Sequence, residues 1–134
     1  MRISSENPLL IEKFLDDISL NATITPQSNS SNILILASVN CAGSDTGLRF
    51  MTGIFRGSTQ IALGDASGSR QRCSTGISGD GSTFAQNVGM NFLDTPSSTS
   101  SLTYKVQVAH TQGINIRING SVDDSNSATY GQRN

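Results

Sequence analysis

The residues best suited to specific contacts lie in the segment "GDASGSRQRCSTGISGDGST", residues 64–83, which has no apolar run that could face a core. Connections longer than about 12–15 residues are uncommon and tend to be functional or disordered. The segment carries Arg70 and Arg72, and guanidinium groups recognise carboxylates and hydroxyl-rich sugars through a fixed fork of donors. We therefore predict a surface loop for recognition or subunit contact, with both arginines as contacts. The alternative is two solvated arginines on a flexible loop.

Catalytic chemistry finds little support in the residue types. The only histidine is His110, predicted at the end of a strand beside a tight turn, and serine and threonine are so abundant that a hydroxyl near it is not evidence of a nucleophile. Glycoside cleavage needs two carboxylates placed across a cleft. The acidic residues instead lie mostly in predicted turns, where aspartate is favoured for local hydrogen bonding. We predict a non-enzymatic protein without catalytic residues; the acidic residues considered are Asp45, Asp65, Asp80, Asp94, Asp123 and Asp124.

Metal and cofactor sites are not expected either. Cys41 and Cys73 cannot form a four-ligand zinc site alone, and the single histidine, His110, lies far from both in the sequence. The segments "SGDGS" (78–82) and "DDSNS" (123–127) offer oxygen donors without the full spacing of a calcium loop. Cys41 continues the alternating apolar set of residues 33–39, so we expect it to be a small buried hydrophobe. A disulfide between the two cysteines remains open.

Composition and charge restrict the partners. The chain has 134 residues, which suits one domain, and nine basic against ten acidic residues. Without a basic stripe, we expect neither nucleic acid nor an anionic membrane as partner. The longest apolar run, "ILILA" at 33–37, is far shorter than the roughly 20 residues of a membrane span. Abundant serine and threonine with no tryptophan are typical of a β-rich surface protein.

The elements that must position these residues are predicted to be strands. Apolar and polar residues alternate with period two, the pattern of half-buried strands, and "RGST" at 56–59 suits a short hairpin connection. Residues 33–39 are apolar on both faces at first, as in a central strand. We predict an all-β fold, an antiparallel β-sandwich or jelly roll. The expected strands cover about residues 18–24, 33–39, 48–55, 60–64, 88–92, 102–109 and 114–118.

The two ends of the chain are predicted to differ from its centre. Residues 1–17 form a lead-in segment, with a short helix or a strand over 7–15, and residues 18–134 form the sandwich domain. Residues 121–134 are polar and offer no closing strand, which would leave an eight-stranded jelly roll one strand short. An unpaired sheet edge is an aggregation hazard. We expect either that the chain continues or that a neighbouring subunit covers this edge.

Four segments together resemble the C-terminal, receptor-proximal domain of tail-fibre-like proteins of tailed phages, especially marine and cyanobacterial ones. They are "ISLNATITPQSNSSNILILASV", "GIFRGSTQIALGDASGSR", "FLDTPSSTSSLTYKVQV" and "INIRINGS", which span roughly residues 18 to 121. The resemblance implies a homotrimer of jelly rolls at the tip of a virion appendage. It also implies contacts with other virion proteins and with a host-surface glycan or protein. Two alternatives are a capsid-attached decoration or head-fibre protein and a non-viral carbohydrate-binding adhesin.

The implied trimer leads to an expectation about its contact residues. Aromatic residues in this chain are candidate core or interface anchors, with the core favoured: Phe50, Phe55, Phe92 and Tyr104. Around a three-fold axis we expect either of two strands to lie nearest the axis. Their contact residues would be Tyr104, Val106 and Val108, or Ile114, Ile116 and Ile118.

Overall fold

The computed structural model describes residues 2–3, 20–43, 49–78, 85–110 and 116–120, and none of these residues is helical. The predicted all-β class is confirmed. The strands are β1 (Arg2–Ile3), β2 (Asn21–Ile24), β3 (Ile33–Gly43), β4 (Arg49–Arg56), β5 (Thr59–Ile61), β6 (Thr75–Ser78), β7 (Gln86–Asp94), β8 (Leu102–His110) and β9 (Ile116–Ile118).

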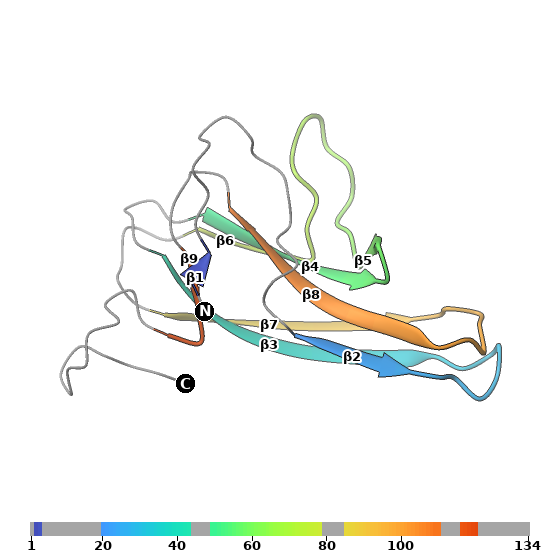
Figure 1. Ribbon diagram of the computed structural model, residues 1–134. Coiled ribbons are helices and arrows are strands. Elements are labelled where there is room, and N and C mark those ends of the chain that lie inside the picture. The colour runs from blue at the N-terminus through green and yellow to red at the C-terminus, as the bar shows by residue number, and fades with distance from the viewer. Residues whose placement is uncertain (1, 4–19, 44–48, 79–84, 111–115, 121–134) are drawn as a thin grey trace.

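The strands form two antiparallel sheets packed against each other, which confirms the predicted sandwich (Figure 1). The first sheet, which we call sheet A, has the order β1-β9-β3-β7. The second, sheet B, has the order β2-β8-β4-β5, and β6 also pairs with β4. Sheet A brings β1 beside β9 and sheet B brings β2 beside β8, so strands from the two ends of the chain are neighbours in both sheets.

The pairing is nested around the middle of the chain. β4 pairs with β6, β3 with β7, β2 with β8 and β1 with β9. Along the chain, the two strands of each pair flank the pair named before it. The further pairs β4–β8 and β3–β9 then join these ribbons into the two sheets. Strand pairing of this kind brings residues far apart in the sequence together, and it determines which side chains meet across the sheets.

The core lies between β3 and β7 of sheet A and β4 and β8 of sheet B. In β7, for example, Val88 and Met90 are buried while Asn87 and Gly89 are exposed, as the predicted alternation requires. Cys41 is fully buried, which confirms its expected role as a small hydrophobe. The core cluster consists of Val39, Cys41, Phe50, Ile54, Val88, Met90, Val106, Val108, Ile116 and Ile118.

The residues expected at a subunit interface are interior in this fold. The described members of that set, Tyr104, Val106, Val108, Ile116 and Ile118, are each at most 8% exposed within the single chain. Their apolar side chains point toward the opposing sheet, so the chain's own strands already cover them. These residues therefore offer almost no exposed surface for a contact with another chain. Ile114 lies outside the described residues.

Two strands are more exposed than their sequences predict. β2 was expected to be half-buried, yet all four of its residues are exposed because it is an edge strand of sheet B. In β3 the first half was expected to be covered on both faces, as in a central strand. Instead Leu34 is 62% and Leu36 is 73% exposed. No described element packs on this outer face of sheet A.

The predicted loop over residues 64–83 is only partly a loop. Thr75–Ser78 forms β6 and pairs with β4, in register from Thr52 opposite Thr75 to Arg49 opposite Ser78. The hairpin connection predicted at 56–59 is confirmed, since β4 and β5 meet across a two-residue turn. Its first residue, Gly57, has φ of 60°, where a type II′ turn takes glycine.

Several predicted features fall partly or wholly outside the described residues. Within the lead-in segment, Arg2 and Ile3 form β1 opposite Arg117 and Ile116 of β9, whereas residues 4–19 are not described. The polar segment 121–134 and the calcium-like segment at 123–127 also lie outside the described ranges, as does most of 78–82.

Candidate functional site

The candidate site is the connection between β5 and β6, residues 62–74, which projects away from β3 and β7 (Figure 1). We call it the arginine loop. Residues 64–72 are all exposed, and none of them belongs to a strand. Serine, glycine and charged residues dominate this stretch, so it has no apolar side chain large enough to anchor it in the core. Its shape must therefore come from polar contacts within the loop.

Those contacts close the loop at its base. The amide of Gly64 donates to the carbonyl of Cys73 across 3.4 Å. The Nε atom of Arg72 donates to the carbonyl of Gly64 across 2.6 Å. Both hydrogen bonds join one side of the base to the other, so Arg72 holds the loop closed. This arrangement uses one of the guanidinium donors of Arg72 for structure.

The tip of the loop presents the other arginine. A turn is formed there by the Arg70 amide, which donates to the Ser67 carbonyl across 3.3 Å, and by Gly68, whose φ is 57°. The Arg70 side chain is exposed and makes no hydrogen bond or ion pair with another described residue. The structure thus separates the two predicted contacts: the donor fork of Arg70 has no acceptor among the described residues, whereas Arg72 supports the loop.

Beneath the loop there is a cavity of about 440 Å³ on the open side of β7. Leu63, Gly64 and Cys73 line it from the loop, and Asn91 and Phe92 line it from β7. Ser74 fixes the wall next to it, because its Oγ accepts a 3.0 Å hydrogen bond from the amide of Ile54. Its amide also donates to the Thr52 carbonyl across 2.9 Å. The loop is therefore anchored to β4 immediately before β6 begins.

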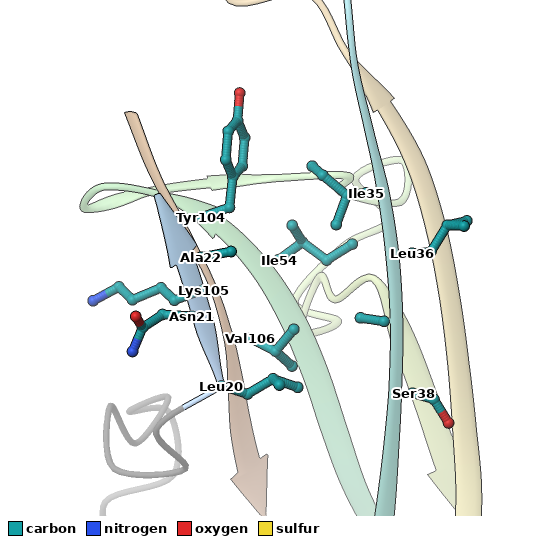
Figure 2. Close-up of a pocket in the computed structure, with 11 residues that line it drawn as sticks. Leu20, Asn21, Ala22, Ile35, Leu36, Ser38, Ile54, Tyr104, Lys105 and Val106 are labelled. Atoms are coloured by element: carbon teal, nitrogen blue, oxygen red, sulfur yellow. The ribbon is translucent and has the colours of Figure 1, made fainter. Parts of the chain in front are cut away.

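A second hollow, of about 180 Å³, lies on the opposite side of the sandwich, between β2 and β3. Figure 2 shows Ile54 and Val106 of sheet B, Leu20 just before β2, and Ile35 of sheet A pointing into it. Lys105 and Asn21 point away from it, and Leu36 lies on the far side of β3. The hollow is apolar and open to solvent, and we call it the side groove.

The most concentrated charge chemistry in the described residues is a cluster that joins the two sheets. Arg56 Nη1 of β4 donates to Asp94 Oδ1 and Oδ2 of β7 at 3.0 and 2.8 Å. Tyr104 of β8 donates its hydroxyl proton to Asp94 Oδ2 at 2.7 Å. Asp94 is buried. Burial of the Tyr104 phenol, followed by its hydrogen bond to Asp94, raises the pKa of Tyr104 to about 12. The carboxylate is fully engaged by its neighbours, so the cluster fastens the sheets together.

The cysteines form no disulfide in the structure: Cys41 is buried and Cys73 is half-buried, and both are free thiols. Burial raises the pKa of Cys41 to about 12 and raises that of Cys73 as well. Within the described ranges, no three His, Cys, Asp or Glu side chains gather into a group that could hold a metal ion. The described part of the chain also has no helix long and apolar enough to cross a membrane.

The arginine loop was visible in the sequence, but the division of roles between Arg70 and Arg72 was not. The inter-sheet cluster was missed altogether, since Arg56 and Asp94 are 38 residues apart and follow no local pattern. Comparison with known proteins assigns no family: no protein-family model matches the sequence, and no curated protein is similar to it.

Proposed function

We propose that this chain is a structural module of a phage virion, of the tail-fibre type, which attaches to the host surface through the arginine loop. The observation that carries the proposal is the presentation of Arg70. The loop is closed at its base by Arg72, and its exposed tip carries an arginine with no partner among the described residues. An exposed loop positioned by a rigid β-sandwich is a common arrangement for binding residues.

The fold supports the same proposal through its strand pairing. A jelly roll has eight strands in two sheets, and it corresponds to one long hairpin rolled up on itself. The nested pairs from β4–β6 outward to β1–β9 follow this order, with β5 and β6 sharing one position beside β4. We therefore infer a jelly roll, the fold that the phage resemblance implies. By the same resemblance we propose three copies of the chain in a virion appendage, in contact with other virion proteins.

The chemistry of Arg70 indicates a class of host ligand. Its planar guanidinium can donate two parallel hydrogen bonds to a carboxylate, or single bonds to sugar hydroxyl groups. A surface polysaccharide that bears carboxylates offers both kinds of acceptor. Because the loop is exposed, salt screens such a contact, and binding should weaken as ionic strength rises.

The decisive experiment measures binding of the purified protein to cells of the bacterial host, with Arg70→Ala, Arg70→Lys and Ser69→Ala as variants. Arg70→Ala should reduce binding about tenfold or more, since a charge-assisted hydrogen bond contributes about 1.5–3 kcal/mol. Arg70→Lys should restore binding only in part because lysine lacks the fork. Ser69→Ala, at the same tip, is the control. Equal binding by Arg70→Ala and the unaltered protein, with the fold intact, would refute the proposal.

The place of the protein on the particle needs a separate measurement. Antibodies raised against the purified chain should label the tail appendage when purified phage particles are viewed by electron microscopy. Label on the capsid would favour the decoration or head-fibre alternative, and unlabelled particles would argue against a virion protein.

A further inference from the structure

The outer face of sheet A carries three exposed leucines. Leu34, Leu36 and Leu93 are 62%, 73% and 57% exposed. Leu34 of β3 lies directly opposite Leu93 of β7 in the register, and Leu36 follows two residues further along β3 on the same face. Together they form one continuous apolar surface, which we call the leucine face. Contiguous apolar surface of this kind in a soluble protein commonly marks a contact site.

The other residues that β3 and β7 place around the leucines are uncharged, whereas Arg117 of β9, opposite Ala42, lies on the same face at the far end of sheet A. Two residues of the face satisfy a third: Asn87 Nδ2 donates to Ser38 Oγ at 2.9 Å and to Asn40 Oδ1 at 2.8 Å. The part of the face on β3 and β7 carries no cationic residue, so it does not suit phosphate, carboxylate or an anionic membrane surface. The residues of β3 and β7 that alternate onto it are Leu34, Leu36, Ser38, Asn40, Asn87, Gly89, Asn91 and Leu93.

The edge of β3 next to the leucine face is also open. The amide of Asn119 donates to the carbonyl of Asn40 across 2.9 Å, so the main-chain groups of Asn40 point away from β7. In an antiparallel strand, every second residue directs its main-chain groups to the same side. The amides and carbonyls of Leu34, Leu36 and Ser38 therefore point there too. β9 pairs only with residues Cys41 to Gly43, and no other described strand pairs with this edge of β3.

We propose that the leucine face and the open edge of β3 pack against a second copy of this chain. The part of the face on β3 and β7 is uncharged, so it can meet its own copy without repulsion between like charges. An open strand edge is also complementary to a strand of another copy, since both present alternating donors and acceptors. Ile33 to Asn40 reads "ILILASVN" and pairs with β7 in an unbroken register, so this edge has none of the lysines, prolines or bulges that normally prevent such contacts.

This inference rests on the proposed function only in requiring several copies, and it does not depend on host attachment. It replaces the interior residues first expected at the contact with three leucines that are exposed in the single chain. In the proposed three-copy assembly, the leucine faces would converge on the common axis. The arginine loop projects away from β3 and β7, so it stays accessible in that arrangement (Figure 1).

The test compares Leu36→Lys with Ile24→Lys. Leu36 is the most exposed of the leucines, so a lysine there costs the isolated chain little, but it would bury a charge in the contact. Ile24, at 44% exposure on the edge strand of sheet B, is the matched control. Sedimentation at micromolar concentration should show a multiple of 14.1 kDa for the unaltered protein and for Ile24→Lys. Leu36→Lys should sediment as a single chain of 14.1 kDa.

If Leu36→Lys still sediments as a multimer, this inference is wrong, and the copies assemble through another surface. A single-chain mass for the unaltered protein also overturns it, and the binding assay with Arg70→Ala still decides the attachment function. Hydrogen exchange on the unaltered protein gives a test that needs no variant. The amides of Leu34, Leu36 and Ser38 should be protected at high concentration and exchange faster after dilution. Equal exchange at both concentrations would contradict the contact.

Discussion

The Tyr104 hydroxyl on β8 donates a 2.7 Å hydrogen bond to Asp94 Oδ2 on β7, and so connects the two sheets of the sandwich. The same carboxylate oxygen lies 2.8 Å from Arg56 Nη1 on β4. Tyr104 and Arg56 are neighbours in the register of sheet B, so both reach the same oxygen of the opposing sheet. Asp94 is thus the central acceptor of a cluster that holds one end of the sandwich closed.

Removing the carboxylate should destabilise the protein. We expect Asp94→Asn to lower the free energy of unfolding by about 2–3 kcal/mol, since it leaves Arg56 partly buried without its counter-ion. Tyr104→Phe should cost about 1.5 kcal/mol, the value of one hydrogen bond to a charged group. Urea unfolding measures both. The double variant should lose less than the sum, because both changes remove the same contact. The cluster would not fasten the sheets if the two losses of unfolding free energy simply added, or if Asp94→Asn left the free energy of unfolding unchanged.

The raised pKa of Tyr104 makes a prediction at alkaline pH. Burial, followed by the hydrogen bond to Asp94, raises this pKa from 10.0 to about 12. The folded state therefore holds the phenol proton more tightly than the unfolded state does. The stability that this contributes is fully present below pH 10 and is lost as pH rises through 12. Unfolding measurements between these pH values should show a steeper loss for the unaltered protein than for Tyr104→Phe, and equal slopes would contradict the shift.

Ultraviolet titration gives an independent measurement of the same pKa. The chain has two tyrosines, Tyr104 and Tyr130. The difference between the titration curves of the unaltered protein and Tyr104→Phe isolates Tyr104. We expect its midpoint well above 10. A midpoint at the ordinary value would mean that the phenol is accessible to water.

The strands that the sequence predicts best are those whose alternation is strong and whose partner covers one face. β7 and β8 follow their apolar positions closely, because Val88, Met90, Val106 and Val108 all enter the core. β6 was missed because Thr75–Ser78 holds a single large apolar residue, Ile77. Its pairing with β4 depends on a strand more than twenty residues earlier, and local periodicity carries no information on such pairing.

Burial was harder to predict than strand position. "ILILA" is apolar on both faces, yet only its odd-numbered residues turn toward the opposing sheet. Alternation shows which residues share a face, but only the three-dimensional arrangement shows whether another element covers that face. The same limit applies to Arg72: its hydrogen bond to Gly64 depends on the closure of the loop, which residue types alone do not reveal.

The two cysteines should differ in reactivity. Cys41 is fully buried, while Cys73 is half-buried beside the cavity under the arginine loop. A disulfide reagent should therefore modify one thiol in the native protein and two after denaturation. Because burial also raises the pKa of Cys73, its reaction should be slower than that of a free thiol at the same pH. Cys73→Ser should abolish the native reaction. Rapid modification of Cys41 in the folded protein would contradict its place in the core.

The role assigned to Arg72 predicts a change in the loop without a change in the core. Arg72→Gln removes the 2.6 Å hydrogen bond from Nε to the Gly64 carbonyl, which holds the base of the loop closed. Because the loop is exposed, the global free energy of unfolding should fall by less than about 1 kcal/mol. Subtilisin, however, should cut residues 64–72 several-fold faster, since cleavage requires local opening. Arg70→Gln, at the tip and without this contact, is the matched control and should be cut at the unaltered rate. Equal cleavage of Arg72→Gln and Arg70→Gln would mean that the arginine loop keeps its shape by other means, and that Arg72 is as available to a ligand as Arg70.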